Sequence, residues 1–201
     1  MAKEEAIIYL ADARKCIQNS ESRSQNSEYR SYQSLKESFL DLTAVNDETL
    51  AAGITISRNG TILIIPLVGD IVTDQRISPG QVQIINNPSI TNPFKDELVN
   101  YILIGFNRNL SKEIIDFDLA NNCLQQLTTN NFFIGKFDGR FDGIHKLPDK
   151  TKGIFAFVIE GVFEVQNRLL HARDGLALTN VTEVEFEALS NEALLLLIEV
   201  Y

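Results

Sequence analysis

The chain contains few residues of the kinds that catalyse reactions or bind transition metals. Two histidines, His145 and His171, and two cysteines, Cys16 and Cys123, occur among its 201 residues. Two histidines cannot supply a metal site that requires three imidazole ligands, and neither has a histidine neighbour. We therefore interpret both as surface residues in loops. The cysteines predict neither a zinc ribbon nor a disulfide framework, so we expect two free thiols that pack as small core residues.

Other catalytic motifs are missing or have the wrong spacing. The sequence has no glycine-rich phosphate loop and no Gly-x-Ser-x-Gly elbow, so it predicts neither nucleotide binding nor a serine hydrolase. Residues 135–143 repeat Phe-Asp-Gly and place Asp138 and Asp142 four residues apart. Calcium loops hold oxygen ligands at alternate positions, whereas phenylalanine and glycine intervene here. We expect this segment to pack as a strand and a turn.

The charge of the chain argues against several classes of partner. Its 27 acidic residues outnumber 18 basic ones, which gives a formal net charge of −9. Such a chain, with no basic run, is a poor partner for nucleic acid or an anionic membrane surface. No stretch approaches the roughly 18 apolar residues of a membrane span, and acids stand near the N-terminus where a signal peptide carries bases. We expect a cytoplasmic protein that binds neither nucleic acid nor membranes directly.

The elements that would position any site are short strands separated by turn residues, so the sequence predicts an all-β fold. Glutamate and apolar residues alternate in 183–187, which predicts a strand with one solvent-exposed face. The run of leucines in 194–197 predicts a central strand buried on both faces. Apolar and β-branched runs predict strands at residues 6–10, 54–56, 61–65, 71–73, 82–85, 98–106, 153–159, 162–165, 176–178, 184–186 and 194–200.

Glycine turns recur at similar spacings in the two halves of the chain, which we interpret as weak duplication of a small antiparallel barrel or sandwich. We predict an N-terminal domain over residues 1–106, a connection over 107–130 and a C-terminal domain over 131–201. A serine-rich loop over 11–38 would cover a surface, or dock a partner or a second subunit in a homodimer.

Several segments resemble the pirin-like proteins, two-domain cupins that include bacterial quercetin dioxygenases. The resemblance rests on residues 65–69 (IPLVG), 79–83 (PGQVQ) and 92–100 (NPFKDELVN), and on 153–161, 163–165 and 173–178 in the second half. Residues 8–12 and 30–32 are similar to the family's N-terminal lead-in. The resemblance implies a fold of two double-stranded β-helix (cupin, or jelly-roll) barrels in tandem.

The same resemblance implies a metal site whose ligands this chain has replaced. Family members hold a divalent metal with three histidines and one glutamate, which begin with a His-x-His-Arg-Gly pattern. Counted back from Gly69, that pattern falls on residues 55–59, where arginine is matched and both histidines are replaced. The family's His-x-Glu pair would fall near residues 90–92, which carry neither ligand type. The positions that the resemblance assigns to the former cavity, or that lie beside it, are Thr55, Ser57, Arg58, Thr61 and Asn92.

We therefore expect a pirin-related bicupin with no metal or other cofactor and no redox catalysis, which binds a small molecule or a protein. A metal-independent enzyme is an alternative, in which Thr55, Ser57 and Arg58 would bind an anionic or polyphenolic ligand. A divergent quercetinase-like oxidoreductase is another. An arginine inside a barrel is costly unless it is paired, so we expect Arg58 to be either salt-bridged or functional.

Overall fold

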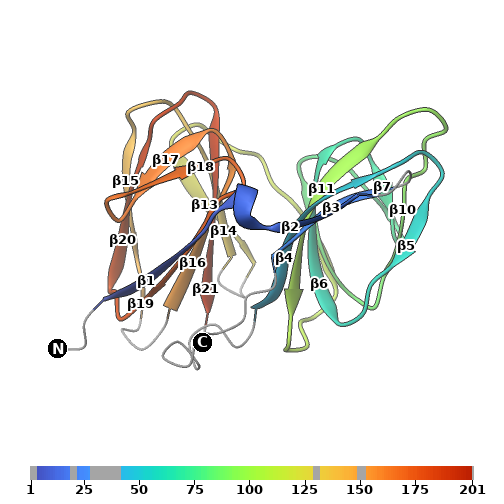
Figure 1. Ribbon diagram of the computed structural model, residues 1–201, viewed down its shortest axis with the longest axis horizontal. Coiled ribbons are helices and arrows are strands. Elements are labelled where there is room, and N and C mark those ends of the chain that lie inside the picture. The colour runs from blue at the N-terminus through green and yellow to red at the C-terminus, as the bar shows by residue number, and fades with distance from the viewer. Residues whose placement is uncertain (1–3, 19–21, 28–41, 129–131, 149–152, 201) are drawn as a thin grey trace. The chain divides into compact units, whose positions relative to one another are not determined.

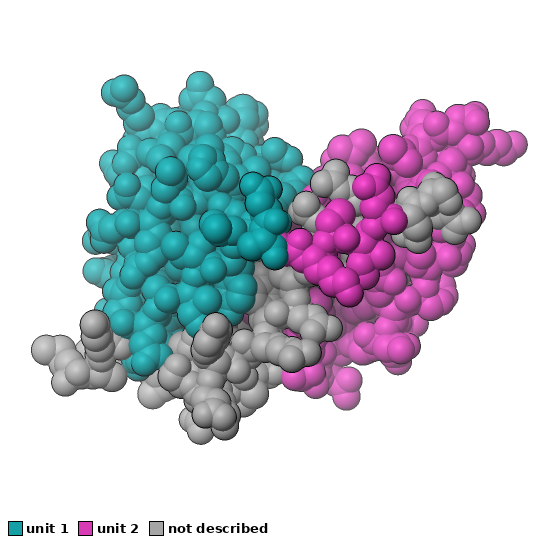
Figure 2. All heavy atoms as spheres, in the orientation of Figure 1, with its two compact units in different colours: residues 1–13, 31–40, 119–201 teal, residues 14–30, 41–118 magenta. Residues whose placement is uncertain are grey.

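The computed structural model describes residues 4–18, 22–27, 42–128, 132–148 and 153–200 (Figure 1). These residues form strands β1 to β21 and one short 3-10 turn, η1 (Ala11–Ala13). They divide into two compact units (Figure 2). The N-terminal unit contains residues 14–18, 22–27 and 42–118. The C-terminal unit contains residues 4–13, 119–128, 132–148 and 153–200.

The N-terminal unit is built from two antiparallel sheets that enclose one apolar core. Seven strands lie in the order β12-β9-β6-β11-β4-β3-β2, and four in the order β5-β10-β7-β8. Its core gathers mainly isoleucine, leucine and valine from both sheets, together with Tyr101. The strands are β2 (Lys15–Gln18), β3 (Ser22–Ser27), β4 (Leu42–Leu50), β5 (Thr55–Ser57), β6 (Thr61–Val68), β7 (Ile71–Val72), β8 (Arg76–Ile77), β9 (Gln81–Asn86), β10 (Ser89–Thr91), β11 (Val99–Phe106) and β12 (Glu113–Asp116).

The C-terminal unit repeats this design with a core richer in aromatic residues. Six strands lie in the order β1-β19-β16-β21-β14-β13, and four in the order β15-β20-β17-β18. Phe137, Phe163 and Phe186 contact one another edge to face within this core. The strands are β1 (Glu5–Tyr9), β13 (Cys123–Thr128), β14 (Phe132–Phe137), β15 (Asp142–Lys146), β16 (Gly153–Glu160), β17 (Val162–Val165), β18 (Arg168–His171), β19 (Gly175–Thr179), β20 (Glu183–Ala188) and β21 (Ala193–Val200).

The apolar runs and glycine turns of the sequence form strands and turns as expected, which confirms the all-β prediction. In β20, Val184 and Phe186 are buried while the glutamates between them are not. Strand β21 lies between β16 and β14, and residues 195–198 are fully buried. Gly69 adopts a φ of +74°, and a Cβ there would lie 2.9 Å from a methyl group of Val99. That turn therefore requires glycine on both backbone and packing grounds.

The unit boundaries differ from the predicted domains at both ends of the N-terminal half. Strand β1 is the edge strand of the C-terminal unit, where Ile7 lies opposite Ala177 of β19 (Figure 1). The predicted connection over 107–130 contributes β12 to one unit and β13 to the other. The predicted serine-rich loop contains β2 and β3, which extend the seven-stranded sheet, while residues 19–21 and 28–38 of that loop lie outside the described part of the chain. Short polar strands at a sheet edge carry little apolar signal, so the sequence pattern does not reveal them.

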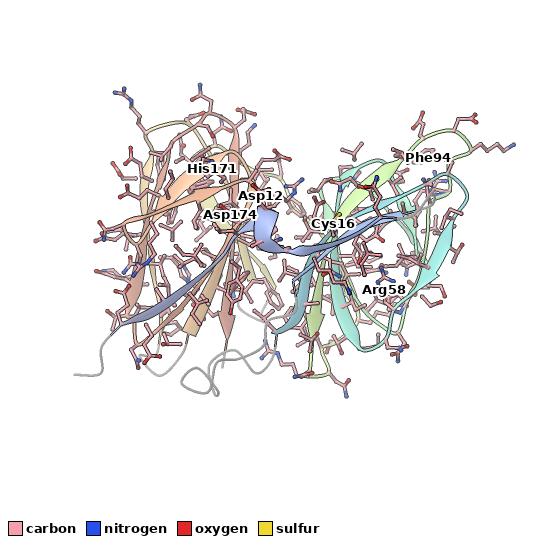
Figure 3. The ribbon with its side chains drawn as sticks, in the orientation of Figure 1. Asp12, Cys16, Arg58, Phe94, His171 and Asp174 are labelled. Carbon is pink, nitrogen blue, oxygen red and sulfur yellow. The ribbon has the colours of Figure 1, made fainter. Side chains whose placement is uncertain are left out.

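The N-terminal segment is fastened to the C-terminal unit by a buried carboxylate. Asp174, which is 4% exposed, accepts the backbone N–H of Ala11 at 2.6 Å and that of His171 at 2.9 Å. One side chain thus holds the turn that follows β1 against the turn that precedes β19. Figure 3 labels Asp174 and Asp12 at this junction.

Replacing Asp174 with alanine should leave both amides without an acceptor and lower the free energy of unfolding by about 2–3 kcal/mol. Urea unfolding at neutral pH measures this loss. Asp118→Ala, at an exposed position, is the control and should change stability by less than about 0.5 kcal/mol. Equal effects of the two variants would show that the junction does not depend on Asp174.

Both cysteines are free and exposed, which corrects the expectation that they pack in the core. Cys16 lies on edge strand β2 and Cys123 on edge strand β13, where side chains reach solvent. In the part of the chain that the structure describes, no helix is long and apolar enough to cross a bilayer.

Candidate ligand site in the N-terminal unit

The two predicted site residues of strand β5, Thr55 and Ser57, lie on its exposed face. Ile54 and Ile56 pack against the apolar core, whereas Thr55 and Ser57 are exposed. The hydroxyl of Thr55 lies 2.8 Å from that of Thr91, on the neighbouring strand β10. Because side chains alternate along a strand, the two predicted cavity residues lie outside the barrel and their apolar neighbours lie inside. The placement of Thr55 and Ser57 in the cavity is therefore corrected.

Thr61 and Asn92 are buried, and both are occupied by structural hydrogen bonds. The Thr61 hydroxyl donates to the side-chain oxygen of Asn86 at 2.6 Å. The Asn92 amide donates to the carbonyls of Leu50, at 2.9 Å, and of Glu97, at 2.7 Å, and its oxygen accepts the N–H of residue 94 at 3.0 Å. Asn92 thus clamps the loop between β10 and β11 and has no donor left for a ligand.

Arg58 is the predicted residue that does reach the interior, where it is salt-bridged. Its Nη2 donates to both carboxylate oxygens of Glu48, at 2.9 and 2.8 Å. Figure 3 labels Arg58 in the N-terminal unit. The Glu48 carboxylate also accepts the Tyr101 hydroxyl at 2.7 Å and the Asn46 amide at 3.0 Å. We call these four residues the Glu48 network. Glu48 is 2% exposed and Tyr101 is fully buried, so the network is shielded from water except at Arg58, whose side chain is 31% exposed.

The strand pattern explains why the members of the Glu48 network meet. Glu48 of β4 and Tyr101 of β11 are register partners, so their side chains share one face. Asn46 lies two residues before Glu48 and therefore on the same face, and Arg58 continues the inward positions of Ile54 and Ile56. Glu48 and Tyr101 were not among the residues predicted from the sequence. The available signal was a polar residue at alternate positions of an otherwise apolar strand face.

The surroundings of Tyr101 keep its hydroxyl protonated. Burial raises the pKa of Tyr101 far above its usual value, and the adjacent Glu48 carboxylate raises it further through charge and the hydrogen bond. The positive charge of Arg58 opposes this rise only in part. The phenol therefore acts as a fixed donor to Glu48.

This shift predicts a stability loss at alkaline pH. Above the ordinary tyrosine pKa of about 10, the unfolded chain loses a proton that folded Tyr101 keeps, so stability falls as pH rises, by up to about 1.4 kcal/mol per pH unit. Tyr101→Phe should be less stable at neutral pH but should lose stability less steeply between about pH 10 and 11. Urea unfolding across this range gives both slopes, and parallel slopes would contradict the prediction.

The residues at the positions that the resemblance assigns to metal ligands do not fit a centre of three histidines and one glutamate. The inward positions of β5 carry hydrocarbon side chains, and Asn92 is already fully hydrogen-bonded. Both oxygens of Glu48 are bound by the guanidinium of Arg58, whose positive charge opposes a cation. Among the described residues, no three His, Cys, Asp or Glu side chains gather closely enough to share an ion.

A separate polar cavity of about 370 Å³ opens in the same unit. Asp74 and Lys112 form an ion pair at its rim, and Asn86, Asn87 and Ser89 contribute polar groups. The side-chain oxygens of Asn86 and Asn87 accept bonds from Thr61 and Gly60, which leaves both amide nitrogens as donors. This cavity therefore combines donors, an acceptor and opposite charges in a space that fits a small polar molecule.

The two histidines have different environments. His171 ends β18 at an exposed position, which agrees with the interpretation of a surface residue, although it lies on a strand. His145 lies on β15 with its side chain only 10% exposed, and its Nε2 is 3.0 Å from a carboxylate oxygen of Glu199. The expectation of a surface loop is therefore wrong for His145.

Several solved structures share the fold of this chain. The crystal structure of the bacterial pirin YhhW from Escherichia coli, in complex with nickel(II), matches with a TM-score of 0.78 at 15% identity, over 96% of this chain and 98% of that chain. GK1651 from Geobacillus kaustophilus matches with a TM-score of 0.73 at 12% identity, over 98% and 96%. The fold is that of a two-barrel cupin, as the resemblance implied.

The sequence of the C-terminal unit is similar to a known family model. Residues 120–200 match the family model of the quercetinase C-terminal cupin domain. A quercetin 2,3-dioxygenase from Acinetobacter baumannii shares the fold, with a TM-score of 0.71 at 12% identity over 99% of this chain and 87% of that chain. No curated protein matches the sequence. Residues 120–200 are thus similar to the quercetinase C-terminal cupin domain, and the chain as a whole has the fold of these cupin structures.

Proposed function

We propose that this chain is a metal-independent pirin-like cupin that works by binding a small polar molecule rather than by oxygenation. The observation that carries the proposal is the Glu48 network. Both oxygens of the buried Glu48 carboxylate are occupied by arginine, phenol and amide donors, and a metal would have to displace these partners.

Two of the structurally similar proteins supply the alternative, because one was solved with a metal and the other is named as an enzyme. YhhW was solved with nickel, and the Acinetobacter protein is named a quercetin dioxygenase. In this chain, threonine and serine stand where the family's first two ligands are expected, and both lie on the exposed face of β5. Hydroxyl groups are weaker ligands than imidazole for the nickel, iron or copper that such enzymes use.

The polar cavity beside Asp74 is the proposed binding place. Its ion pair and its two amide donors would orient a ligand with several hydroxyl or carboxyl groups, and the apolar side chains of Ile85 and Pro88 would contact the ligand's carbon skeleton. The net charge of −9 supports a role through small molecules or proteins rather than through direct contact with nucleic acid.

Metal analysis of the purified protein tests the first half of the proposal. After incubation with Fe²⁺, Ni²⁺, Cu²⁺ or Zn²⁺ and desalting, we expect far less than one ion per chain and no oxygen consumption with quercetin. Near-stoichiometric metal that is lost in the variant Glu48→Gln would overturn the proposal. Metal that is lost only in His145→Gln would place the ion in the C-terminal unit and would also overturn the proposal that the chain is metal-independent.

Ligand screening tests the second half. Thermal shift measurements with a panel of sugars, polyols and hydroxy acids should identify compounds that stabilise the protein. Ser89→Phe would fill part of the cavity and should abolish such a shift, whereas Ser111→Phe, at an exposed position outside the cavity, should retain it. A compound that stabilises both variants equally would place binding elsewhere.

A further inference from the structure

The C-terminal unit contains a buried carboxylate that its own residues leave half satisfied. Glu199 is 1% exposed, and its Oε1 lies 3.0 Å from Nε2 of His145. Its Oε2 is buried and accepts no hydrogen bond from any residue that the structure describes. Buried polar atoms are almost always paired, so an unpaired carboxylate oxygen indicates a missing donor.

The strand registers show that this pair points into the barrel. Glu199 follows Leu195 and Leu197 at alternate positions of β21, and both leucines belong to the C-terminal core. His145 lies opposite Val184, another core residue. Phe133, which packs against the same core, places its ring 4.5 Å from the imidazole. The carboxylate, imidazole and aromatic ring therefore share one interior corner.

The chemistry of this corner selects the kind of group that would complete it. Transition metals require three or four ligands, and no third His, Cys, Asp or Glu of the described residues joins this pair. A buried carboxylate is instead compensated by a cation that also donates hydrogen bonds. An ammonium group supplies both, and the adjacent Phe133 ring face offers a cation–π contact.

We propose that the C-terminal barrel holds a second ligand site, in which Glu199, positioned by His145, binds the ammonium group of a small primary amine. His145 is the more exposed member of the pair, so the ligand enters from its side. The ligand's carbon chain lies against Phe133 and the apolar interior. This site is independent of the proposed cavity in the N-terminal unit.

Histidine ring NMR provides a direct test, because the chain has two histidines and gives two sets of ring signals. The probe is n-butylammonium chloride, added to ring-labelled protein in the presence of EDTA. The His145 signals should shift with saturation in the millimolar range, since so small a probe buries little surface. The His171 signals should stay in place and serve as the internal reference. Equal concentrations of sodium chloride and of n-butanol control for ionic strength and for the carbon chain.

Two variants decide whether the carboxylate is responsible. Glu199→Gln keeps the shape of the side chain and should raise the half-saturation concentration at least tenfold. Glu187→Gln, on the outer face of the C-terminal unit, should bind as the unaltered protein does. Unshifted His171 signals and thermal unfolding report whether each variant is folded. If Glu199→Gln does not fold, Glu199→Asp takes its place.

Three results would overturn the proposal. The first is an absence of any saturable shift of His145, the second is an equal shift with sodium chloride or n-butanol, and the third is unchanged binding in a folded Glu199 variant. In the absence of EDTA, a response of His145 to ZnCl₂ but not to the amine would replace the ammonium assignment with a metal. The polar-ligand screen of the N-terminal unit is unaffected by these outcomes.

Discussion

Replacing Glu48 with alanine should lower the free energy of unfolding by about 3–5 kcal/mol, the cost of breaking a buried ion pair from one side. The loss arises because three donors are left without their acceptor. Arg58 is 31% exposed and can turn to water, but the Tyr101 hydroxyl and the Asn46 amide are buried and cannot. Urea unfolding at neutral pH measures the change. Glu97→Ala, the loss of an exposed carboxylate, is the matched control and should cost less than about 0.5 kcal/mol.

A combined variant separates the contribution of the buried charges to stability from the contribution of the volume that their side chains fill. Glu48→Leu, Arg58→Met and Tyr101→Phe together remove the charges and the buried hydroxyl while keeping similar volumes. Replacement of a whole buried network by apolar side chains is often neutral, so the triple variant should be more stable than Glu48→Ala by at least about 2 kcal/mol. A triple variant as unstable as the single one would show that the network contributes net stability. A single variant that loses less than about 1 kcal/mol would show that Glu48 is exposed in solution.

The strands of the fold were predictable from sequence wherever burial produces a strong pattern. Residues 61–65, 98–106, 153–159 and 194–200 are mainly apolar because both faces or one whole face of each strand is buried. Each predicted range lies within an observed strand, except that Leu98 precedes β11 and is exposed. The partner of β1 was not predictable in this way. Its apolar run indicates a strand, but nothing in five residues specifies that the neighbour is β19, about 170 positions away.

The candidate site illustrates a different limit. The resemblance pointed to β5, and Arg58 proved to be the inward residue, salt-bridged as expected for an arginine inside a barrel. Thr55 and Ser57 were predicted to point into the cavity, but they lie on the exposed face of the strand. A shift of one residue along a strand moves every side chain to the other face. The acceptor for Arg58 lies ten residues earlier, on another strand and in another sheet, so its identity depends on the folded arrangement rather than on local spacing.

The repeated Phe-Asp-Gly segment shows what such a motif contributes to the fold. Phe137 is 1% exposed and stacks on Phe141 at 5.3 Å between ring centroids. It also contacts Phe163 at 6.0 Å and Phe186 at 5.0 Å, both edge to face. The expectation of strand-and-turn packing is confirmed, because β14 ends at Phe137 and the following turn brings Phe141 back over its ring.

Phe137→Ala should therefore lower the free energy of unfolding by about 4 kcal/mol, through lost burial, the cavity left behind and the lost ring contacts. Phe141→Ala removes the stacked partner from a half-buried position and should cost about 1–2 kcal/mol. Because the two rings contact each other, the double variant should lose less than the sum of the two single losses. Urea unfolding of the three variants measures this cycle. If the two single losses of stability add up exactly in the double variant, the stacked pair contributes nothing beyond the area that each ring buries. The stability of the C-terminal barrel would then rest on the contacts of Phe137 with Phe163 and Phe186.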